Sequence, residues 1–291
     1  STLLFATLGI ALVVAIFSVP LARRLVRPVR SMAAATRELA SGQYAVRVPV
    51  DSSDELGQLS RDFNEMALTL EKNEKARRQW VADISHELRT PLSVLIGEIE
   101  ALLEGVRATT PDAVRSLHAE ARRLHRLVDD LYQLSLSDLG ALTYRKEDLD
   151  LADLLRDSME PYLPEFRRKG IAVAAEIQEE DNLCVFADQE RMRQLFTNLL
   201  DNSLKYTDSD GRLAVRLARR DSEAAIDFED SAPGVAEPEM ERLFDRLYRV
   251  ETSRNRASGG AGLGLAICKN IVEAHGGAIS AHPSSLGGVR I

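Results

Sequence analysis

The chain has 291 residues, of which 45% are hydrophobic and 28% are charged. This length and composition are sufficient for two or three domains with packed cores. The formal net charge of −8 gives no support for direct nucleic-acid binding, because proteins that bind phosphate backbones usually carry a basic surface. Cys184 and Cys268 lie far apart without metal-ligand spacing, so we expect two reduced thiols, as in a cytoplasmic protein.

Residues 1–22 carry no charge and are predicted to form a transmembrane helix. At a rise of about 1.5 Å per residue, such a helix reaches roughly 33 Å, enough to cross a bilayer core. Four arginines follow at once: Arg23, Arg24, Arg27 and Arg30. By the positive-inside rule they place the rest of the chain in the cytoplasm. A signal peptide is the alternative, and it is disfavoured because the basic residues follow the apolar run.

Residues 23–75 are predicted to form two helical stretches around a connector at residues 41–53. In the second stretch apolar residues alternate at spacings of three and four, which is typical of a short coiled-coil seam. The seam consists of Leu56, Leu59, Phe63, Met66 and Leu70. An ordinary amphipathic hairpin is the alternative interpretation of this region.

Residues 76–140 are predicted to form two antiparallel amphipathic helices, the second capped by Thr110 with Pro111 in its first turn. Apolar stripes on both helices are too extensive for the pair to bury alone, so we expect a dimeric four-helix bundle. The stripes are Val81, Ile84, Leu88, Leu92 and Leu95, then Val114, Leu117, Ala121, Leu124, Val128 and Leu131. His118 and His125 are expected at the surface.

His86 lies opposite the first stripe, together with Asp83, Glu87 and Thr90. A neutral imidazole is a nucleophile, and a carboxylate beside it can accept or orient its ring proton. An isolated His-Glu pair on a helix is usually an ordinary surface feature, so the pair alone does not predict catalysis.

Residues 147–291 mix helix and strand patterns, and we predict an α+β sandwich, a sheet with helices on one face. Strands are expected at residues 171–177, 213–217 and 224–230. In the last of these, Ile226 and Phe228 alternate with Asp227 and Glu229, as in a strand with one solvated face.

A helix is predicted from the cap Asp188 to about Tyr206, and Asn198, Asn202 and Lys205 share one of its faces. Amide oxygens suit Mg²⁺ that also binds phosphates, and the lysine supplies positive charge. Two asparagines on a helix are more often simply solvated. Asp230 ends a strand, where its carboxylate could accept a hydrogen bond from the amine of adenine.

A glycine-rich run, Gly259–Leu265, opens a predicted helix that ends near Ala274. Glycines let backbone N–H groups approach phosphate, and a helix N-terminus favours an anion. A Rossmann loop is an alternative, although no strand directly precedes the run. A P-loop is excluded because no Gly-Lys-Ser/Thr follows.

These segments occur in the order of the sensor histidine kinases of bacterial two-component systems, which the chain resembles over nearly its whole length. The resemblance is carried by a HAMP-like linker with Pro28 and Asp54–Gly57, the phosphoacceptor box His86–Leu92, the N-box Asn198–Thr207, the first glycine box Asp230–Val235, the F-box Leu243–Arg249 and the second glycine box Gly259–Leu265. It implies a GHKL-type (Bergerat) ATP-binding domain. Residues 229–235 and 253–270 further resemble envelope-stress sensors of the BaeS type.

The resemblance implies roles for individual residues. His86 would accept the γ-phosphoryl group of ATP, Glu87 would act as base, and Thr90 would position a water for dephosphorylation of the regulator. Asn202 would bind Mg²⁺ with Asn198 close by. The remaining nucleotide contacts would come from Lys205, Tyr206, Asp230, Gly234, Gly260, Gly262, Leu263 and Gly264.

The sequence departs from the family pattern at Ser203, Ala232 and Leu247, where alanine, glycine and an aromatic residue are usual. Arg246 and Arg249 are possible phosphate contacts, and residues 254–260 are expected to form a lid over the nucleotide.

The chain is therefore predicted to be a homodimeric protein-histidine kinase of the bacterial inner membrane, with its HAMP and kinase domains in the cytoplasm and an aspartate of a response regulator as phosphoryl acceptor. It begins without Met and ends within an expected strand, so we expect a fragment lacking a sensor domain. Two alternatives remain: a GHKL ATPase of the chaperone or gyrase kind, which leaves His86 unexplained, and a catalytically degenerate membrane scaffold.

Overall fold

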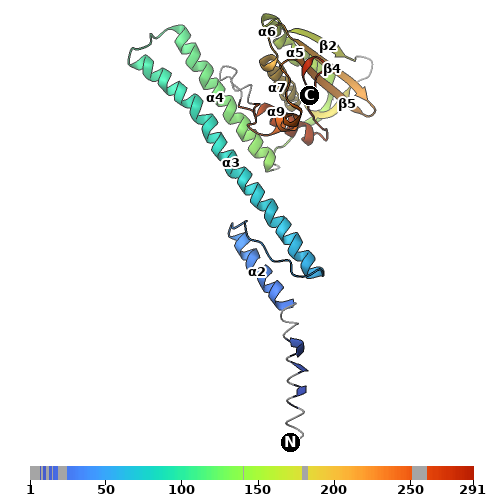
Figure 1. Ribbon diagram of the computed structural model, residues 1–291. Helices are drawn as coiled ribbons and strands as arrows, with labels where there is room; N and C mark the ends of the chain where they lie inside the picture. Colours follow the sequence, from blue (N-terminus) through green and yellow to red (C-terminus); the bar gives the residue numbers. More distant parts are fainter. Residues whose placement is uncertain are drawn as a thin grey trace. The chain divides into compact units, whose positions relative to one another are not determined.

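The computed structural model describes residues 7, 9–10, 13–14, 16–18, 25–139, 141–178, 183–250 and 261–291 (Figure 1). The chain divides into two units, Ser1–Ile84 and Ser85–Ile291. Among the described residues, no helix is both long enough and apolar enough to cross a membrane. The predicted transmembrane segment, residues 1–22, falls largely outside them.

The first unit contains α2 (Arg27–Ala40) and the beginning of α3 (Glu55–Leu103). Asp54 fixes the start of α3, because its Oδ1 accepts hydrogen bonds from the N–H groups of Leu56 (3.1 Å) and Gly57 (3.2 Å). The connector between the helices is held to α3 by the Asn64 amide, which bonds both the N–H and the carbonyl of Val48 at 2.8 and 2.9 Å. A small core closes this helical pair and consists of Ala35, Leu39, Val48, Phe63 and Ala67.

The predicted coiled-coil seam on α3 is only partly buried within the chain. Phe63 is 6% exposed, but Leu59 and Met66 are 48% and 47% exposed. Helix α3 packs against α2 through Phe63 and Ala67, which are four residues apart, and this leaves Leu59 and Met66 outside the core. The coiled-coil seam stays a prediction, because its exposed residues would face a second protomer.

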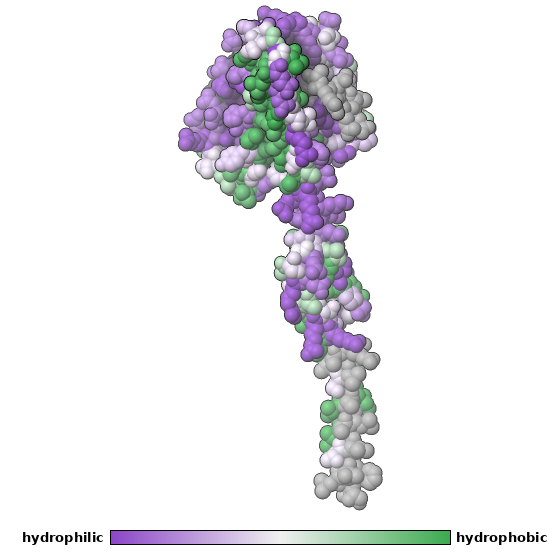
Figure 2. Space-filling view, turned by 90° about the vertical axis from the view of Figure 1, so that its left-hand side faces the viewer, coloured by the Kyte–Doolittle hydropathy of each residue, from purple (hydrophilic) through white to green (hydrophobic). Residues whose placement is uncertain are grey.

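In the second unit, the rest of α3 and α4 (Pro111–Asp138) form the predicted helical hairpin. The predicted cap is confirmed, since Thr110 Oγ1 accepts a hydrogen bond from the N–H of Ala113 at 3.2 Å. Figure 2 shows that apolar surface, coloured green, gathers in a band on the broad upper part of the molecule, between polar surfaces coloured purple. Apolar side chains of the hairpin that remain exposed are Leu92, Val94, Ile96, Ile99, Leu103, Val114 and Val128. Leu92, expected on the buried stripe, is 45% exposed, which leaves part of both stripes uncovered in a single chain.

The described residues of the C-terminal part form two sheets. The smaller pairs β1 (Lys146–Asp150) with β3 (Cys184–Asp188) in antiparallel orientation. The larger has the order β2-β4-β5-β7-β6, in which only β2 and β4 run parallel. Its strands are β2 (Ala172–Ile177), β4 (Arg212–Arg220), β5 (Glu223–Ser231), β6 (His282–Pro283) and β7 (Gly287–Arg290). All three predicted strands are present, whereas β1 and β3 were not expected.

Helices α5 (Leu151–Met159), α7 (Gln189–Tyr206) and α9 (Gly264–Ala274) lie on one face of the larger sheet (Figure 1). Shorter elements of this part are the helices α6 (Leu163–Arg168) and α8 (Glu237–Met240) and the 3-10 turns η2 (Glu160–Tyr162) and η3 (Glu241–Phe244). The layers meet in a core that includes Leu155, Phe166, Phe196, Leu200, Leu213, Val215 and Leu217, each less than 2% exposed. This arrangement confirms the predicted α+β sandwich.

Glu229 on β5 corrects the predicted strand pattern. It was expected on the solvated face, but it is only 4% exposed. Its carboxylate accepts hydrogen bonds from the N–H (2.7 Å) and hydroxyl (2.6 Å) of Ser285, and Arg216 lies 3.3 Å away. The Ser285 hydroxyl holds the pKa of this carboxyl below its usual range. The turn between β6 and β7 covers the face that alternation alone assigns to solvent.

Candidate functional site

Helix α7 carries the predicted nucleotide-binding face, and its start is fixed by Asp188. The Oδ1 of Asp188 accepts a hydrogen bond from the N–H of Arg191 (3.1 Å), and its Oδ2 accepts one from the N–H of Arg145 (2.8 Å). The N–H of Asp188 donates to Nε2 of His275 at 3.1 Å, which joins the helix to the end of α9. These contacts set the rotation of α7 and direct one of its faces toward α9.

A cavity of about 590 Å³ lies beside this face of α7. Such a volume is typical of sites for small molecules and cofactors. Predicted nucleotide contacts that line it are Asn198, Asn202, Lys205, Tyr206, Asp230, Gly234, Gly262, Leu263 and Gly264. The whole predicted lid, residues 254–260, falls outside the described residues, and Gly260 with it. Residues from three separate predicted boxes therefore meet in one cavity.

Asp230 forms one end of the cavity. Its Oδ1 accepts a hydrogen bond from the N–H of Val289 at 2.7 Å, so β7 fixes the carboxylate in place. A Cβ atom on Gly288 would lie 2.2 Å from that oxygen, so this close approach requires glycine. Burial raises the pKa of Asp230 to about 6, and the nearby Glu229 adds to the shift. A half-buried carboxylate that is held at one oxygen can accept a hydrogen bond from a ligand at the other.

The glycine loop and the F-box segment hold each other at the opposite wall. The N–H of Leu247 donates to the carbonyl of Gly262 at 3.0 Å. Gly262 has a φ of 71°, and a Cβ atom there would lie 2.8 Å from the carbonyl oxygen of Tyr248. Leu247, at the position where an aromatic residue is usual, has a φ of 60°. A left-handed conformation costs roughly 1–2 kcal/mol for a residue other than glycine, so the packing of this segment must hold it there.

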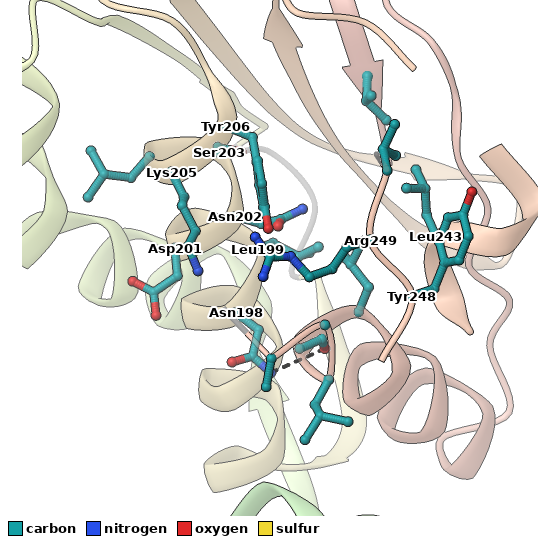
Figure 3. Close-up of a pocket in the computed structure, with 18 of the residues that line it drawn as sticks. Asn198, Leu199, Asp201, Asn202, Ser203, Lys205, Tyr206, Leu243, Tyr248 and Arg249 are labelled. Carbon is teal, nitrogen blue, oxygen red and sulfur yellow. Dashed lines mark hydrogen bonds between the residues drawn. The ribbon is translucent and has the colours of Figure 1, made fainter. Parts of the chain in front are cut away.

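The N-terminus of α9 faces the cavity through Leu263 and Gly264. Asn198 stands close to this turn, with its Nδ2 3.4 Å from the carbonyl oxygen of Gly264 (Figure 3). Free N–H groups at a helix N-terminus attract anions. This wall of the cavity therefore suits the phosphates of a nucleotide.

Positive charge converges on the same space. Lys205 and Arg249 both line the cavity, and Figure 3 shows the guanidinium of Arg249 beside Asn202. Burial lowers the pKa of Lys205 to about 8, and the charges of Arg249 and of Arg123 on α4 contribute to the shift. Mutual repulsion of these half-buried cations is relieved when an anion binds between them, which makes the cavity receptive to phosphate. Arg246, the other arginine considered for this role, does not line the cavity.

The predicted phosphoacceptor segment lies on α3. His86 and Thr90 are exposed, and the Thr90 hydroxyl donates to the carbonyl of His86 at 3.2 Å. Glu87 is half-buried and lines the same cavity as the nucleotide-binding face of α7. The structure therefore brings the neighbour of His86 to the predicted ATP site. His118 and His125 are exposed, as expected.

Two side-chain contacts between α4 and the α+β part were not predicted from the sequence. The guanidinium of Arg246 forms a bidentate ion pair with the carboxylate of Asp138. The amide of Gln194 on α7 donates to Oε1 of Gln133 at 2.7 Å. Both contacts join residues that are far apart in the sequence, and neither type of side chain signals such a pairing by itself.

Lys169, at the end of α6, does not line the cavity but supports it from the end of α7, and it was not predicted. Its Nζ donates to the carbonyls of Leu204 (2.8 Å), Lys205 (3.4 Å) and Thr207. These carbonyls end α7, where intrahelical partners are lacking. A cation at a helix C-terminus is also favoured by the helix dipole. Lys169 therefore anchors the turn that carries Lys205 and Tyr206.

We expect Lys169→Met to lower the free energy of unfolding by about 1–3 kcal/mol, because buried carbonyls lose a charged hydrogen-bond donor. Chemical denaturation of parent and variant measures the change. Arg168→Met is the matched control: its guanidinium pairs with Glu165 at the surface at 3.6 Å, and such pairs contribute about 0–1 kcal/mol. Equal loss in both variants would contradict a special role for Lys169.

Comparison with known proteins places three domains on the chain. Residues 21–72 match the HAMP domain, and residues 76–140 match the His Kinase A (phospho-acceptor) domain. Residues 187–291 match the histidine kinase-, DNA gyrase B- and HSP90-like ATPases. The three matches follow one another in the predicted order.

Curated relatives resemble the chain over most of its length. It is 52% identical over 271 residues to the signal transduction histidine-protein kinase BaeS of Escherichia coli (strain K12), which covers 93% of this chain and 58% of BaeS. It is 34% identical over 294 residues to AfsQ2 of Streptomyces coelicolor, covering 94% of this chain and 53% of AfsQ2. The chain thus spans about half the length of these curated relatives.

Solved structures share the fold. The histidine kinase AdeS of Acinetobacter baumannii matches with a TM-score of 0.58 at 25% identity, over 68% of this chain and 90% of AdeS. Histidine kinase ThkA, solved in complex with the response regulator TrrA, matches with a TM-score of 0.59 at 20% identity, over 76% of this chain and 61% of ThkA. With its HAMP, phosphoacceptor and ATPase domains and its similarity to BaeS, the chain belongs to the sensor histidine kinases.

Proposed function

We propose that this chain is the cytoplasmic signalling part of a membrane sensor that phosphorylates His86 from ATP and passes the phosphoryl group to an aspartate of a response regulator. One observation carries the proposal. Glu87, next to His86, lines the same cavity as Asn202, Lys205 and Asp230. Neither an ATPase of the chaperone or gyrase kind nor a scaffold without catalysis explains why the neighbour of an exposed histidine lines a nucleotide-type cavity.

In the proposed reaction the neutral imidazole of His86 attacks the γ-phosphorus of ATP. A nitrogen–phosphorus bond forms, the bond between the γ-phosphorus and the β,γ-bridging oxygen breaks, and ADP leaves. The ring proton of the imidazole passes to the carboxylate of Glu87. The phosphoryl group then moves from His86 to a carboxylate oxygen of the regulator's aspartate, which regenerates the imidazole.

Different residues around the cavity are proposed to bind different parts of the nucleotide. Asp230 would accept a hydrogen bond from the adenine amine, and Tyr206 would pack against the nucleotide. Lys205 and the N–H groups at Gly262–Gly264 would hold the phosphates. Asn202 and Asn198 fit Mg²⁺, since amide oxygens are hard ligands that leave other positions for phosphate oxygens. When bound, the ion would neutralise phosphate charge.

A homodimer, a response regulator and a lipid bilayer are the proposed partners. The exposed apolar residues of the hairpin support a second protomer, which would cover them in a four-helix bundle. The regulator would bind near His86 on that bundle. The uncharged residues 1–22 and the arginines after them support an inner-membrane location with the HAMP and kinase domains in the cytoplasm. BaeS is described as a signal transduction kinase, which agrees with this proposal.

Thr90 is proposed to serve dephosphorylation of the regulator rather than phosphorylation of His86. It lies exposed one helical turn after His86. We expect Thr90→Ala to retain autophosphorylation and to lose phosphatase activity toward the phosphorylated regulator. Both rates can be followed with labelled phosphate. Equal loss of both activities would contradict a separate role for Thr90.

Lys205 should make ATP binding dependent on pH. Its pKa is lowered to about 8 in the free protein, and bound phosphates would raise it again. Its contribution to affinity is therefore complete below about pH 8 and declines as the pH rises above that value. ATP titrations from about pH 7 to about pH 9.5 should show this decline, and Lys205→Met should remove it. Lys269→Met, an exposed lysine of α9, is the control that should retain it.

Incubation of the protein with γ-labelled ATP and Mg²⁺ tests the function. We expect label on the parent protein and none on His86→Gln, whereas the exposed control His125→Gln should be labelled like the parent. Nucleotide turnover without labelled protein would favour a GHKL ATPase. Absence of ATP binding would favour the scaffold.

A further inference from the structure

The ATP cavity is closed by helices of the same chain. The ATPase side supplies most of its lining, but α3 contributes Glu87 and Pro91. Helix α4 contributes Arg123, Leu124, Arg126, Leu127 and Asp130. The phosphoacceptor hairpin of the same chain therefore forms part of the cavity wall.

Independent contacts hold this arrangement together. Asp138 on α4 pairs with Arg246, and Gln133 on α4 bonds Gln194 on α7. Both contacts attach the ATPase domain to its own α4. In an antiparallel four-helix bundle each α4 adjoins two copies of α3, one from its own chain and one from the partner. The presence of Glu87 and Pro91 in the lining shows that the cavity opens toward the α3 of its own chain.

Arg123 is the cation that the hairpin brings to the cavity. It is half-buried, with its NH1 3.4 Å from Oε1 of Glu120. Its charge contributes to the lowered pKa of Lys205, so the two cations act on the same space. Arg122, the preceding residue, is exposed and lies outside the cavity. An arginine in this position can donate two hydrogen bonds to phosphate oxygens.

We propose that autophosphorylation occurs in cis: the hairpin of each chain completes the nucleotide site of that same chain, presenting its own His86 and contributing Arg123 as a phosphate-binding residue. The proposal rests on the function proposed above. The bonds made and broken are those already described, with the nucleophile and the nucleotide held by one chain.

Two defined heterodimers test the direction of transfer. The chains are co-expressed with different tags and purified through both. The first heterodimer pairs the parent chain with the double variant His86→Gln, Asn202→Ala. Transfer in cis predicts label on the parent chain, because its histidine and its nucleotide site are both intact. Transfer in trans predicts no label.

The second heterodimer pairs His86→Gln with Asn202→Ala. Transfer in cis predicts no label on either chain, whereas label on the Asn202→Ala chain would overturn the proposal. A parent homodimer without label would instead show that the proposed function is wrong, so the two failures are distinguishable. If the purified protein is monomeric, labelling at a rate independent of protein concentration supports transfer within one chain, and a rate that rises with concentration overturns it.

Arg123 has its own test. We expect Arg123→Met to reduce the rate of labelling about tenfold or more, because a charged hydrogen bond to phosphate is lost. Arg123→Lys should recover part of the rate through its charge, and Arg122→Met should behave like the parent. Thermal unfolding of each variant identifies any loss of folding. A folded Arg123→Met protein that is labelled at the parent rate would overturn the role of Arg123.

Discussion

Asn202→Ala is expected to reduce autophosphorylation by about two to three orders of magnitude, which is typical when a group that stabilises transition-state charge is removed. Asn202 lines the same cavity as Lys205 and Arg249, and the guanidinium of Arg249 lies beside it (Figure 3). An alanine there removes an oxygen ligand from the proposed Mg²⁺ site and leaves the phosphates less well neutralised. The rate of label incorporation at saturating ATP measures the effect.

Thr197→Ala is the control for this prediction. Thr197 lies on the same helix and bonds the carbonyl of Gln194 at 3.0 Å, away from the cavity. The Thr197→Ala protein should be labelled at nearly the parent rate. A second measurement separates the effect on Mg²⁺ binding from the effect on the rate of phosphoryl transfer. The Mg²⁺ concentration needed for half-maximal ATP binding should rise in Asn202→Ala and stay at the parent value in Thr197→Ala. An unchanged rate in Asn202→Ala would remove this residue from the proposed site.

Asp230→Asn is expected to weaken ATP binding about 10- to 100-fold. The carboxylate is half-buried and is held by the N–H of Val289 at 2.7 Å, so its orientation toward the cavity is fixed. A hydrogen bond to a charged group contributes about 1.5–3 kcal/mol, which corresponds to the expected loss. Displacement of a fluorescent ATP analogue measures the affinity. Discrimination between ATP and GTP should fall with it, because the proposed contact is to the adenine amine.

The raised pKa of Asp230 adds a dependence on pH. The ionised form accepts the hydrogen bond, so affinity should be constant above about pH 6 and should decline as the pH falls through that value. Asp230→Asn should not show this decline. Asp227→Asn on the same strand is the control, because Asp227 pairs with Arg220 at 3.0 Å at the surface. An affinity for ATP that is unchanged in Asp230→Asn would contradict the assigned role.

Local patterns in the sequence were sufficient for much of this fold. The cap at Thr110, the cap at Asp188 and the periodicity of α7 each depend on residues within a few positions of one another. These patterns also placed Asn198, Asn202 and Lys205 on one face, and the structure has all three on the wall of one cavity.

Features that depend on residues distant in the sequence were missed or wrong. The alternation of apolar and polar residues along β5 placed Glu229 in solvent. The turn at Ser285 that covers it lies 56 residues away, so the local pattern could not include it. Lys169 binds carbonyls about 36 residues away, and Asp138 pairs with Arg246 across 108 residues. Periodicity also could not say which side of the apolar stripe around Phe63 would be covered by α2.

The most direct test of the central claim is to locate the labelled phosphoryl group after one turnover. The protein is mixed with γ-labelled ATP and Mg²⁺, digested at alkaline pH, and analysed by mass spectrometry. We predict one phosphopeptide containing His86, with a label that is stable to alkali and labile to acid, as expected for phosphohistidine. Label that is stable to acid, or label on another residue that persists in His86→Gln, would contradict the assignment of His86 as the phosphoryl acceptor.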